Sequence, residues 1–479
     1  MNAPVPLRRV LKFRTIVSTS TGLAYAAISF LGCVQLASLV GGDSGWIAIL
    51  LAALLAMLSA CCFSELNTLY PTAAAVRLYM KEAFSDNFSL IVAFSYMLTI
   101  VTLIAADSYV VGNAITYAFN LPGWASLIWI LALFGLATGA NLRSIKLAGL
   151  LQDVTTYLLL AIAIIISIIA LSQHGFQLRS PLDALSHPFD LLNAVAVGIF
   201  VFSGFEWVTP LSEEITNIKL IPRGMFIALG LLFVSYALFT VAASNVLGVD
   251  VHNQALANSP IPQMLLGKAA LGQVGIWVML ITTLLTTVMT LNGGFAAASR
   301  FLYAAAREGT LPPIFAHISI KYAVPYVAVI ALAAASAAVA IIIFLTGQFQ
   351  FLILLGAVLE ALIYVIAALC VIRLRQLQPA AERSFRIRGG WTVPIATVVI
   401  FGLLGILASL GIGSSGVLIG TPLIATVAIF MLAALYVYLF IPHLRRAAAA
   451  RQAVTRRRRP GREANSTETG ASVSRAPRE

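Results

Sequence analysis

Charged side chains are scarce in this sequence: Asp, Glu, Lys and Arg together make up 10% of its 479 residues. Soluble domains carry about 25% charged residues, so this chain has too few to cover a water-exposed surface. Apolar residues make up 60% of the chain, and the mean hydropathy is +0.96. This balance excludes a soluble enzyme, a disordered scaffold and a fibrous protein, and it predicts a protein that crosses a membrane many times.

Residues that usually carry catalysis are also few. The five histidines all fall outside the apolar runs, and no Gly-rich phosphate loop or Ser/His/Asp set is present. The four cysteines fall inside apolar runs, without the spacing of a disulfide framework or a metal site, which favours a packing role. They are Cys33, Cys61, Cys62 and Cys370. We therefore expect no enzymatic activity, no metal and no cofactor.

Long apolar runs are abundant instead. A spanning helix needs about 20 mostly apolar residues, whereas the strands of a membrane barrel show shorter alternating segments. The runs here are continuous, so the prediction is an all-α membrane protein with twelve spans. The predicted spans are Thr15–Val40, Gly45–Phe63, Phe88–Phe119, Trp124–Ala140, Leu147–Leu171, Leu191–Leu211, Gly224–Val246, Gly272–Ala298, Val324–Phe344, Phe351–Ile372, Val393–Ile412 and Leu418–Ile441.

Basic residues are distributed unevenly between the two sides that twelve spans define. One side, which includes both termini, holds 28 of the 30 Lys and Arg residues, and only Arg179 and Lys268 lie on the other. Because basic loops stay in the cytoplasm, we predict a multi-pass protein of the cytoplasmic membrane with both termini inside the cell. The run Arg456–Arg459 in the C-terminal tail is interpreted as a disordered anchor on anionic lipid. No aromatic platform accompanies it, which argues against nucleic acid as a partner.

Two spans contain residues that weaken a helix. The first span holds small and hydroxylated residues over Ser18–Ala27, and the sixth holds Ser203-Gly204 followed by Glu206 and Pro210. Interrupted spans at matching places in two repeats indicate a transporter's binding site, whereas the alternative is close helix packing on small residues. The first and sixth spans match if spans 1–5 and 6–10 are the repeats. The freed N–H groups of such a break suit a carboxylate, and its freed carbonyls suit an ammonium group.

Four segments resemble the amino acid–polyamine–organocation superfamily of secondary transporters. They are Ser64–Pro71 with Tyr79–Phe84, Asn141–Arg143 with Leu151–Asp153, Gly204–Glu206 with Ser212–Glu214 and Ile221–Gly224, and Ala298–Pro312. The resemblance implies a five-plus-five inverted-repeat core with spans 11 and 12 peripheral. It also implies alternating access to a midplane site between spans 1, 3, 6, 8 and 10, with amino acids and amines as substrates. The expected organisation is a cytoplasmic N-terminus (1–14), two five-helix repeats (15–172 and 190–373), peripheral spans (391–441) and a basic tail (442–479).

The chain departs from the family at three places, one of which is Asn217-Ile218, where the family usually has Asn-Pro after the glutamates of the sixth span. The Gly-x-Gly of the first span is replaced by Ala26, Ala27 or Ile28, with Gly22 as an alternative register. A Lys that many members carry in the fifth span, where it stands in for sodium, is replaced by Leu158 or Leu159. A fixed cation is therefore missing at this place.

Three carboxyl groups lie inside predicted spans: Asp107, Glu206 and Glu360. A carboxylate at mid-bilayer costs roughly 2.5–3.5 kcal/mol on insertion scales, so each needs a proton, a bound cation or water. They can couple protons or attract a substrate ammonium group, and the alternative is a protonated carboxyl bonded to a neighbouring helix. The hydroxyls of Thr286, Thr287 and Thr290 are interpreted as bonding within their own helix.

The function predicted from the sequence is transport of amino acids by alternating access, as proton-coupled symport or as exchange. The alternative is a carrier of polyamines or cationic amines. A small-molecule substrate, a proton and the lipid bilayer are the expected partners. Coupling or gating is assigned to Glu206, Glu360 and Asp153. Candidate substrate-binding residues are Thr21, Gly22, Ala26, Ala27, Asp107, Phe202, Ser203, Gly204, Phe205 and Phe295.

Overall fold

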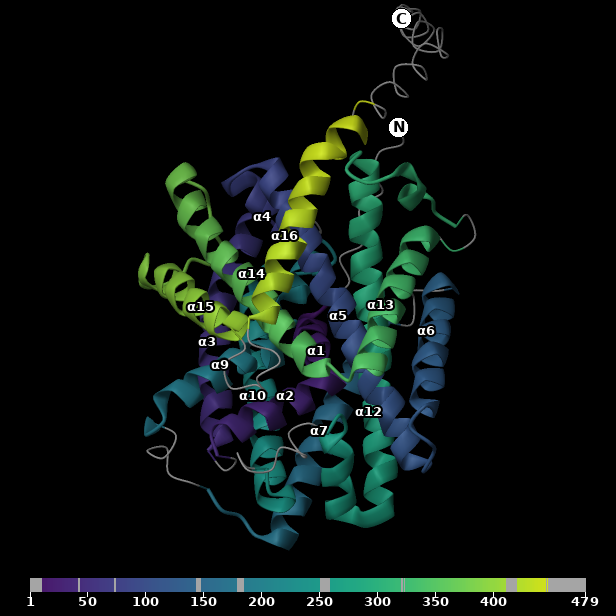
Figure 1. Ribbon diagram of the computed structural model, residues 1–479. Coiled ribbons are helices and arrows are strands. Elements are labelled where there is room, and N and C mark those ends of the chain that lie inside the picture. Colours follow the sequence, from purple (N-terminus) through teal and green to yellow (C-terminus); the bar gives the residue numbers. More distant parts are fainter. Residues whose placement is uncertain are drawn as a thin grey trace, which may run out of the picture.

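The computed structural model describes residues 11–41, 44–72, 75–143, 148–178, 185–249, 259–319, 322, 324–410, 420–444 and 446. Over these residues the chain is helical and contains no β-strand, only one isolated bridge between Leu11 and Ile215. Eleven segments are long and apolar enough to cross a membrane, and a twelfth is a helix pair bent by 60°. The predicted all-α architecture of twelve spans is confirmed (Figure 1).

The first part of the chain forms α1 (Phe13–Ala24), α2 (Ala27–Leu39), α3 (Gly45–Leu69), α4 (Ala75–Ala83), α5 (Asp86–Ala118), α6 (Ala125–Arg143) and α7 (Ala148–His174). The second part forms α9 (Pro188–Phe202), η1 (Phe205–Leu211), η2 (Ile218–Leu220), α10 (Ile221–Leu247), α12 (Pro262–Arg307), η3 (Pro313–Ala316), α13 (Tyr326–Thr346), α14 (Phe349–Leu377), α15 (Thr392–Leu410) and α16 (Thr421–Leu439).

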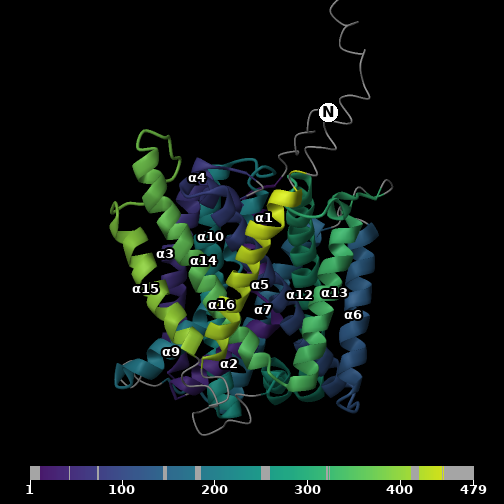
Figure 2. The same ribbon diagram turned by 45° about the horizontal axis from the view of Figure 1, so that its top comes forward.

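The spans differ sharply in how deeply they are buried. In the most apolar 18-residue stretch of each span, 89% of the residues are buried in the segment that contains α9 and η1 and 83% in α14, whereas only 17% are buried in the segment that contains α16. The helices α6 and α15 lie at opposite edges in both Figure 1 and Figure 2, and α16 crosses one face. The interrupted sixth span therefore occupies the centre of the molecule, and α16 lies at its periphery, as predicted.

Polar side chains inside the spans mostly bond to their own helix. The hydroxyls of Ser95 and Thr116, for example, donate to the carbonyls four residues earlier at 2.9 and 2.8 Å. Since lipid offers no partner for polar groups, this local bonding lets them cross the membrane without breaking the helix.

The eighth span starts at the predicted residue, Gly272, and runs past the predicted end at Ala298 to Arg307. A short helical segment precedes it within α12, because Leu271 and Gly272 have non-helical dihedrals, including φ +58° at Gly272, that separate Pro262–Ala270 from the main span. A Cβ on Gly275 would lie 1.8 Å from the carbonyl oxygen of Gly267. The short Pro262–Ala270 segment thus folds back on the main span, and only glycines permit this approach.

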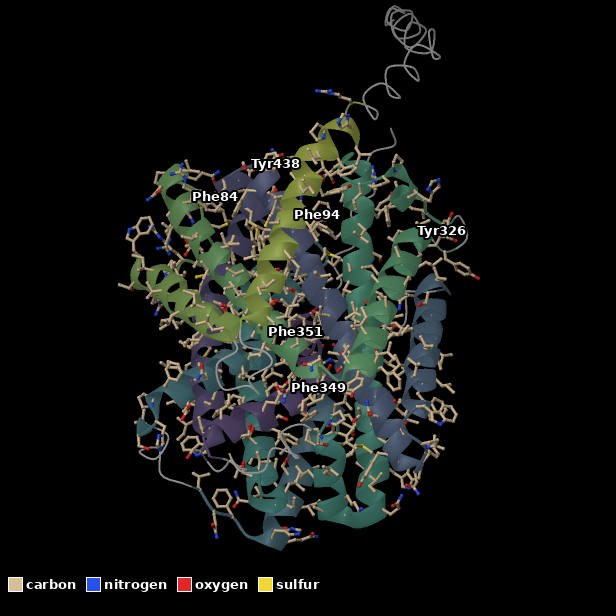
Figure 3. All side chains as sticks on the ribbon, in the orientation of Figure 1. Phe84, Phe94, Tyr326, Phe349, Phe351 and Tyr438 are labelled. Atoms are coloured by element: carbon tan, nitrogen blue, oxygen red, sulfur yellow. The ribbon has the colours of Figure 1, made fainter. Side chains whose placement is uncertain are left out.

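Contacts between connecting segments place several of them at one end of the molecule. Arg77 of α4 forms an ion pair with Glu308 after α12, and Tyr436 of α16 donates to the Thr310 carbonyl at 2.9 Å. The N–H of Leu11 donates to the Glu214 carbonyl at 3.0 Å. In Figure 3 the exposed side chains of Phe84 and Tyr438 lie toward this end, while Phe349 and Phe351 lie deeper, at the start of α14.

Candidate functional site

The first span is broken at Tyr25 and Ala26. Helix α1 ends at Ala24, Ala26 is extended with φ −87° and ψ 154°, and α2 begins at Ala27. Of the two registers that the sequence allowed, the structure adopts the one at Ala26 and Ala27. Thr21 and Gly22 belong to the last turns of α1. The Thr21 hydroxyl donates to the Val17 carbonyl at 2.8 Å, so it bonds within its own helix.

The sixth span is broken at Ser203 and Gly204. Helix α9 ends at Phe202, Gly204 has φ +108°, and the chain continues as the 3₁₀ helix η1. A positive φ is readily adopted by glycine and strained for other residues. A Cβ on Gly204 would lie 3.1 Å from the backbone carbonyl of Leu23, one residue before the end of α1. The two breaks are therefore in direct backbone contact.

The predicted aromatic residues pack into the core around the breaks. Phe202 contacts Tyr236 of α10 edge-on at 5.8 Å between ring centroids, and Phe205 contacts Phe63 of α3 at 6.4 Å. Phe295 of α12 is fully buried as well. The neighbouring Gly294 packs so closely that a Cβ would lie 2.7 Å from Ile104 Cδ1 of α5. These contacts fix the positions of the helices on either side of the breaks.

A carboxyl pair lies beside the sixth-span break. Glu206 is 1% exposed and accepts from the Tyr96 hydroxyl at 2.6 Å, the Gly204 N–H at 3.2 Å and the Tyr364 hydroxyl at 3.4 Å. Glu360 of α14 is fully buried and adjoins Glu206, Ser203 and Tyr364. Neither oxygen of Glu360 has a hydrogen-bond partner among the described residues. No ion pair within the described part of the chain includes either glutamate.

A third carboxyl group lies at the first-span break. Asp107 of α5 is fully buried, and its Oδ1 accepts from the N–H of Ile28 in the first turn of α2 at 2.9 Å. The backbone of Ala27 and the hydroxyls of Thr287 and Thr290 adjoin the same carboxyl group. Its Oδ2 has no hydrogen-bond partner within the described ranges. The structure thus brings Asp107 to the break although 79 residues separate it from Ile28.

Two tyrosines at the first-span break were not among the predicted site residues. Tyr236 donates from its hydroxyl to the Ala24 carbonyl, the last of α1, at 2.8 Å. The Tyr25 hydroxyl bonds Ser235 at 2.9 Å, and the rings of Tyr25 and Tyr236 are stacked at 5.5 Å. A buried tyrosine needs a partner for its hydroxyl, but the sequence alone does not distinguish such a residue from one at the membrane interface. The same holds for Tyr96 and Tyr364.

Asp153, the third predicted gating residue, lies away from the breaks. It joins the start of α7 to the start of α1, where it accepts from Arg14 Nε at 2.9 Å, from the Thr15 hydroxyl at 3.2 Å and from the Ser18 hydroxyl. It is therefore paired with a base, unlike the three carboxyl groups at the breaks.

A second arginine-paired carboxyl group was not singled out from the sequence. Arg375 of α14 donates to both oxygens of Glu65 of α3 at 2.8 and 2.6 Å. Arg383 lies 3.4 Å from the same carboxylate, and the Ile387 N–H donates to it at 3.0 Å. This buried group ties α3 to α14 and to the connection that follows α14.

A helical membrane protein with two interrupted spans in contact, and with buried carboxyl groups at both breaks, has the construction of a secondary transporter. The family model described as amino acid permease matches residues 11–442, and the chain belongs to this family. The resemblance found in the sequence motifs is thereby confirmed.

Individual relatives agree with this assignment. The chain is 26% identical to Asc-type amino acid transporter 1 of Homo sapiens over 386 residues, which cover 76% of this chain and 72% of the relative. It is 26% identical to large neutral amino acids transporter small subunit 2 of Homo sapiens over 412 residues, 82% of this chain and 73% of the relative. It is also 23% identical to an uncharacterized amino acid permease, YecA, of Bacillus subtilis (strain 168) over 321 residues, 66% of this chain and 74% of the relative. The chain is accordingly an amino acid transporter with many membrane spans.

Proposed function

We propose that this transporter moves neutral amino acids across the cytoplasmic membrane together with protons, with both termini in the cytoplasm. The two repeats are residues 15–172 and 190–373, and access alternates around the contact between Gly204 and Leu23. The named substrates of one relative, large neutral amino acids, support the substrate class. The described residues at the two breaks offer carboxyl and hydroxyl groups to a substrate, which argues against an acidic one.

The observation that carries the proton proposal is the pair formed by Glu206 and Glu360. Both carboxyl groups are buried side by side, and two negative charges at this distance cannot both persist without a cation. No described base pairs with them, so a proton is the natural neutralising ion. The hydroxyls of Tyr96 and Tyr364 reach Glu206 from two other helices and can donate to its charged form.

Coupling requires that the proton be held differently in the two access states. Glu206 lies on η1, directly after the break, and its Oε2 accepts from the N–H of Gly204 within the break itself. A movement of η1 that admits water would change both this hydrogen bond and the solvation of the carboxyl pair. The proton would then be taken up on one side of the membrane and released on the other.

The proposed orientation is supported by the basic residues and the contacts of the connecting segments. The end that carries Arg77, Arg14 and Arg375 is assigned to the cytoplasm because basic loops are retained there. A Cys at the exposed position Gly123, between α5 and α6, should react with an impermeant reagent added outside intact cells. A Cys at the exposed position Ser384 should react only after the cells are opened. The opposite pattern would reverse the orientation.

The function itself is tested with the purified full chain in proteoliposomes. Uptake of radiolabelled leucine is measured with an inward proton gradient, with a sodium gradient, and with unlabelled leucine inside. Accumulation driven by the proton gradient is the expected result. Accumulation driven by sodium alone would contradict the proton proposal, and exchange without accumulation would make the protein an obligate exchanger.

A further inference from the structure

The end of α14 and its connection to α15 carry two sets of arginines. The side chains of Arg375 and Arg383 are buried and lie against the Glu65 carboxylate, which pairs with both. Arg386 and Arg388 are exposed instead, and no ion pair within the described part of the chain includes them. The fold therefore neutralises the first set, whereas the charge of the second set is left for a ligand or for water.

The inward contacts hold the connection in one path. The Ile387 N–H donates to the Glu65 carboxylate at 3.0 Å, and Arg375 donates to the Gly390 carbonyl at 2.5 Å. Arg383 donates to two carbonyl groups at the end of α14, each at 3.2 Å. The outward arginines thus stand on backbone that is already ordered, so binding there needs little further ordering of the chain, which favours affinity.

The two outward arginines share one side of the chain. Exposure alternates along this stretch: Arg386 and Arg388 are exposed, and Ile387 between them is 5% exposed. Side chains that alternate in this way point in the same direction at positions two apart. A guanidinium group presents planar, paired donors that match the oxygens of a phosphate or a carboxylate. The connection has a single acidic residue, Glu382, so the stretch keeps a net positive charge and suits an anion with several oxygens.

An apolar surface begins beside these arginines. Gly389 and Gly390 turn the chain with φ +97° and +64°, and Trp391 follows them, 42% exposed, directly before α15. Tryptophan is enriched where a span meets the membrane surface. Exposed apolar side chains then continue along α15 at helical spacing: Ile395, Val399, Leu403 and Ile406. In Figures 1 and 2 this helix lies at an outer edge of the molecule, where lipid can reach it.

We propose that Arg386, Arg388 and Trp391 bind the headgroup phosphate of an anionic phospholipid, and that its acyl chains lie along α15. A soluble anion would use the arginines alone, whereas a lipid uses both the charge and the apolar surface that continues from it. Under the proposed orientation the lipid belongs to the cytoplasmic leaflet. The site is independent of the transported substrate, because it lies outside the two interrupted spans.

The first test compares ligands on the purified full chain in a neutral detergent. Dioleoyl phosphatidylglycerol, dioleoyl phosphatidylcholine, glycerol 3-phosphate and inorganic phosphate are each titrated, and thermal unfolding measures the stabilisation. Phosphatidylglycerol should reach half of its full effect at a concentration about tenfold or more below that of phosphatidylcholine, whose choline group offsets the charge of the phosphate. The two soluble phosphates, which lack acyl chains, should not act in the same range.

The second test changes the site. Arg386→Gln combined with Arg388→Gln should weaken phosphatidylglycerol about tenfold or more, since each basic residue near a membrane surface strengthens binding roughly fivefold. Trp391→Ala should weaken it less, because the ring contributes contact area but no charge. The matched control, Lys219→Gln combined with Arg223→Gln, removes the same charge from exposed positions around the start of α10. It should bind the lipid as the parent does.

Each outcome decides the proposal. Equal stabilisation by the two phospholipids, or equal weakening in the control, would show that the arginines act only as topological charges, and the proposal is wrong. Stabilisation by free phosphate in the same range would assign the arginines to a soluble anion and would also overturn it. Should the double variant not fold, native mass spectrometry of Arg388→Gln counts the phosphatidylglycerol molecules that the chain retains. Fewer than in the parent supports the site, and an unchanged number contradicts it. A failure of leucine uptake in proteoliposomes would leave these results unaffected.

Discussion

The buried carboxyl groups that pair with arginines and those at the breaks differ in their partners. At the proposed cytoplasmic end, Glu65 is held by Arg375 through two hydrogen bonds, and Asp153 is held by Arg14. Such pairs fix helices against one another, because removing one partner leaves the other charge buried. The pairing explains why these two carboxyl groups join elements that are distant in sequence.

At the breaks, by contrast, carboxyl groups meet hydroxyls, N–H groups and one another. Asp107, Glu206 and Glu360 take part in no ion pair within the described residues. A carboxyl group without a fixed counter-ion can exchange a proton or a ligand without breaking the fold. The comparison supports the proposal that paired carboxyl groups hold the scaffold and unpaired ones serve transport.

The largest effect should follow from closing the sixth-span break while leaving the arginine pairs intact. In Gly204→Leu the Cβ atom would lie 3.1 Å from the Leu23 backbone. The residue would also have to adopt a φ of +108°, which leucine rarely does. Leucine uptake should fall to background, while the protein still inserts into the membrane. Gly402→Leu is the control, since a Cβ there has open space. Normal uptake by Gly204→Leu would show that the break is ordinary packing.

Neutralising a carboxyl group should change the free energy of unfolding differently in the two groups. Glu65→Gln leaves Arg375 buried without its counter-charge and should lower the free energy of unfolding by about 3 kcal/mol. Glu360→Gln removes a charge that has no partner and should leave stability unchanged or raised. Thermal unfolding of the purified proteins measures both. Equal losses of stability in the two variants would contradict the comparison.

Proton coupling should depend on Glu206. Glu206→Gln keeps the shape of the side chain but cannot titrate, so uptake should lose its response to a pH gradient and show a flat pH profile. Exchange of internal for external leucine should stay within about twofold of the parent, because no interaction with a neutral substrate is removed. Flux in proteoliposomes between pH 5 and pH 8 measures both properties. Retained gradient-driven accumulation would transfer the coupling role to Glu360.

The two tyrosines that contact Glu206 should differ in their importance. Tyr96 donates at 2.6 Å and Tyr364 at 3.4 Å, so the first hydrogen bond is the stronger. Tyr96→Phe should therefore move the pH midpoint of uptake farther than Tyr364→Phe does. The same pH series measures this difference: equal shifts would contradict it, and no shift in either variant would mean that the hydroxyls do not affect the titration of Glu206.

The smallest effect is expected at Asp153. The side chain of Arg14 is 62% exposed, and ion pairs with an exposed partner contribute about 0–1 kcal/mol. Asp153→Asn should thus lower thermal stability slightly and leave the pH profile of leucine uptake as in the parent. A changed pH dependence would move Asp153 into the group of coupling residues.

The sequence predicted the spans well because apolar length is a local property. Deep helices such as α14 and surface helices such as α16 give the same apolar signal, although their burial differs widely. The fold-back at Gly272 was missed, because it depends on two glycines meeting through space rather than on hydropathy.

The chemistry of the site was only partly accessible to sequence reasoning. Unpaired carboxyls stand out in apolar runs, which is how Asp107, Glu206 and Glu360 were found. Their partners do not, because Tyr96 and Tyr364 lie 110 and 158 residues from Glu206 and look like ordinary aromatic residues of a span. The register of the first-span break also required the structure, since small residues occur along most of that span.

The thin protein cover of α16 has a consequence for how its sequence can change over time. Where a helix is surrounded mainly by lipid, the requirement on most positions is hydrophobicity, and many combinations of Leu, Ile, Val and Met meet it. Exceptions are the positions that contact protein, such as Tyr436 beside Phe94 and Thr310. Orthologous transporters should therefore diverge fastest along α16 and slowest along α9 and α14, where each side chain must fit its neighbours.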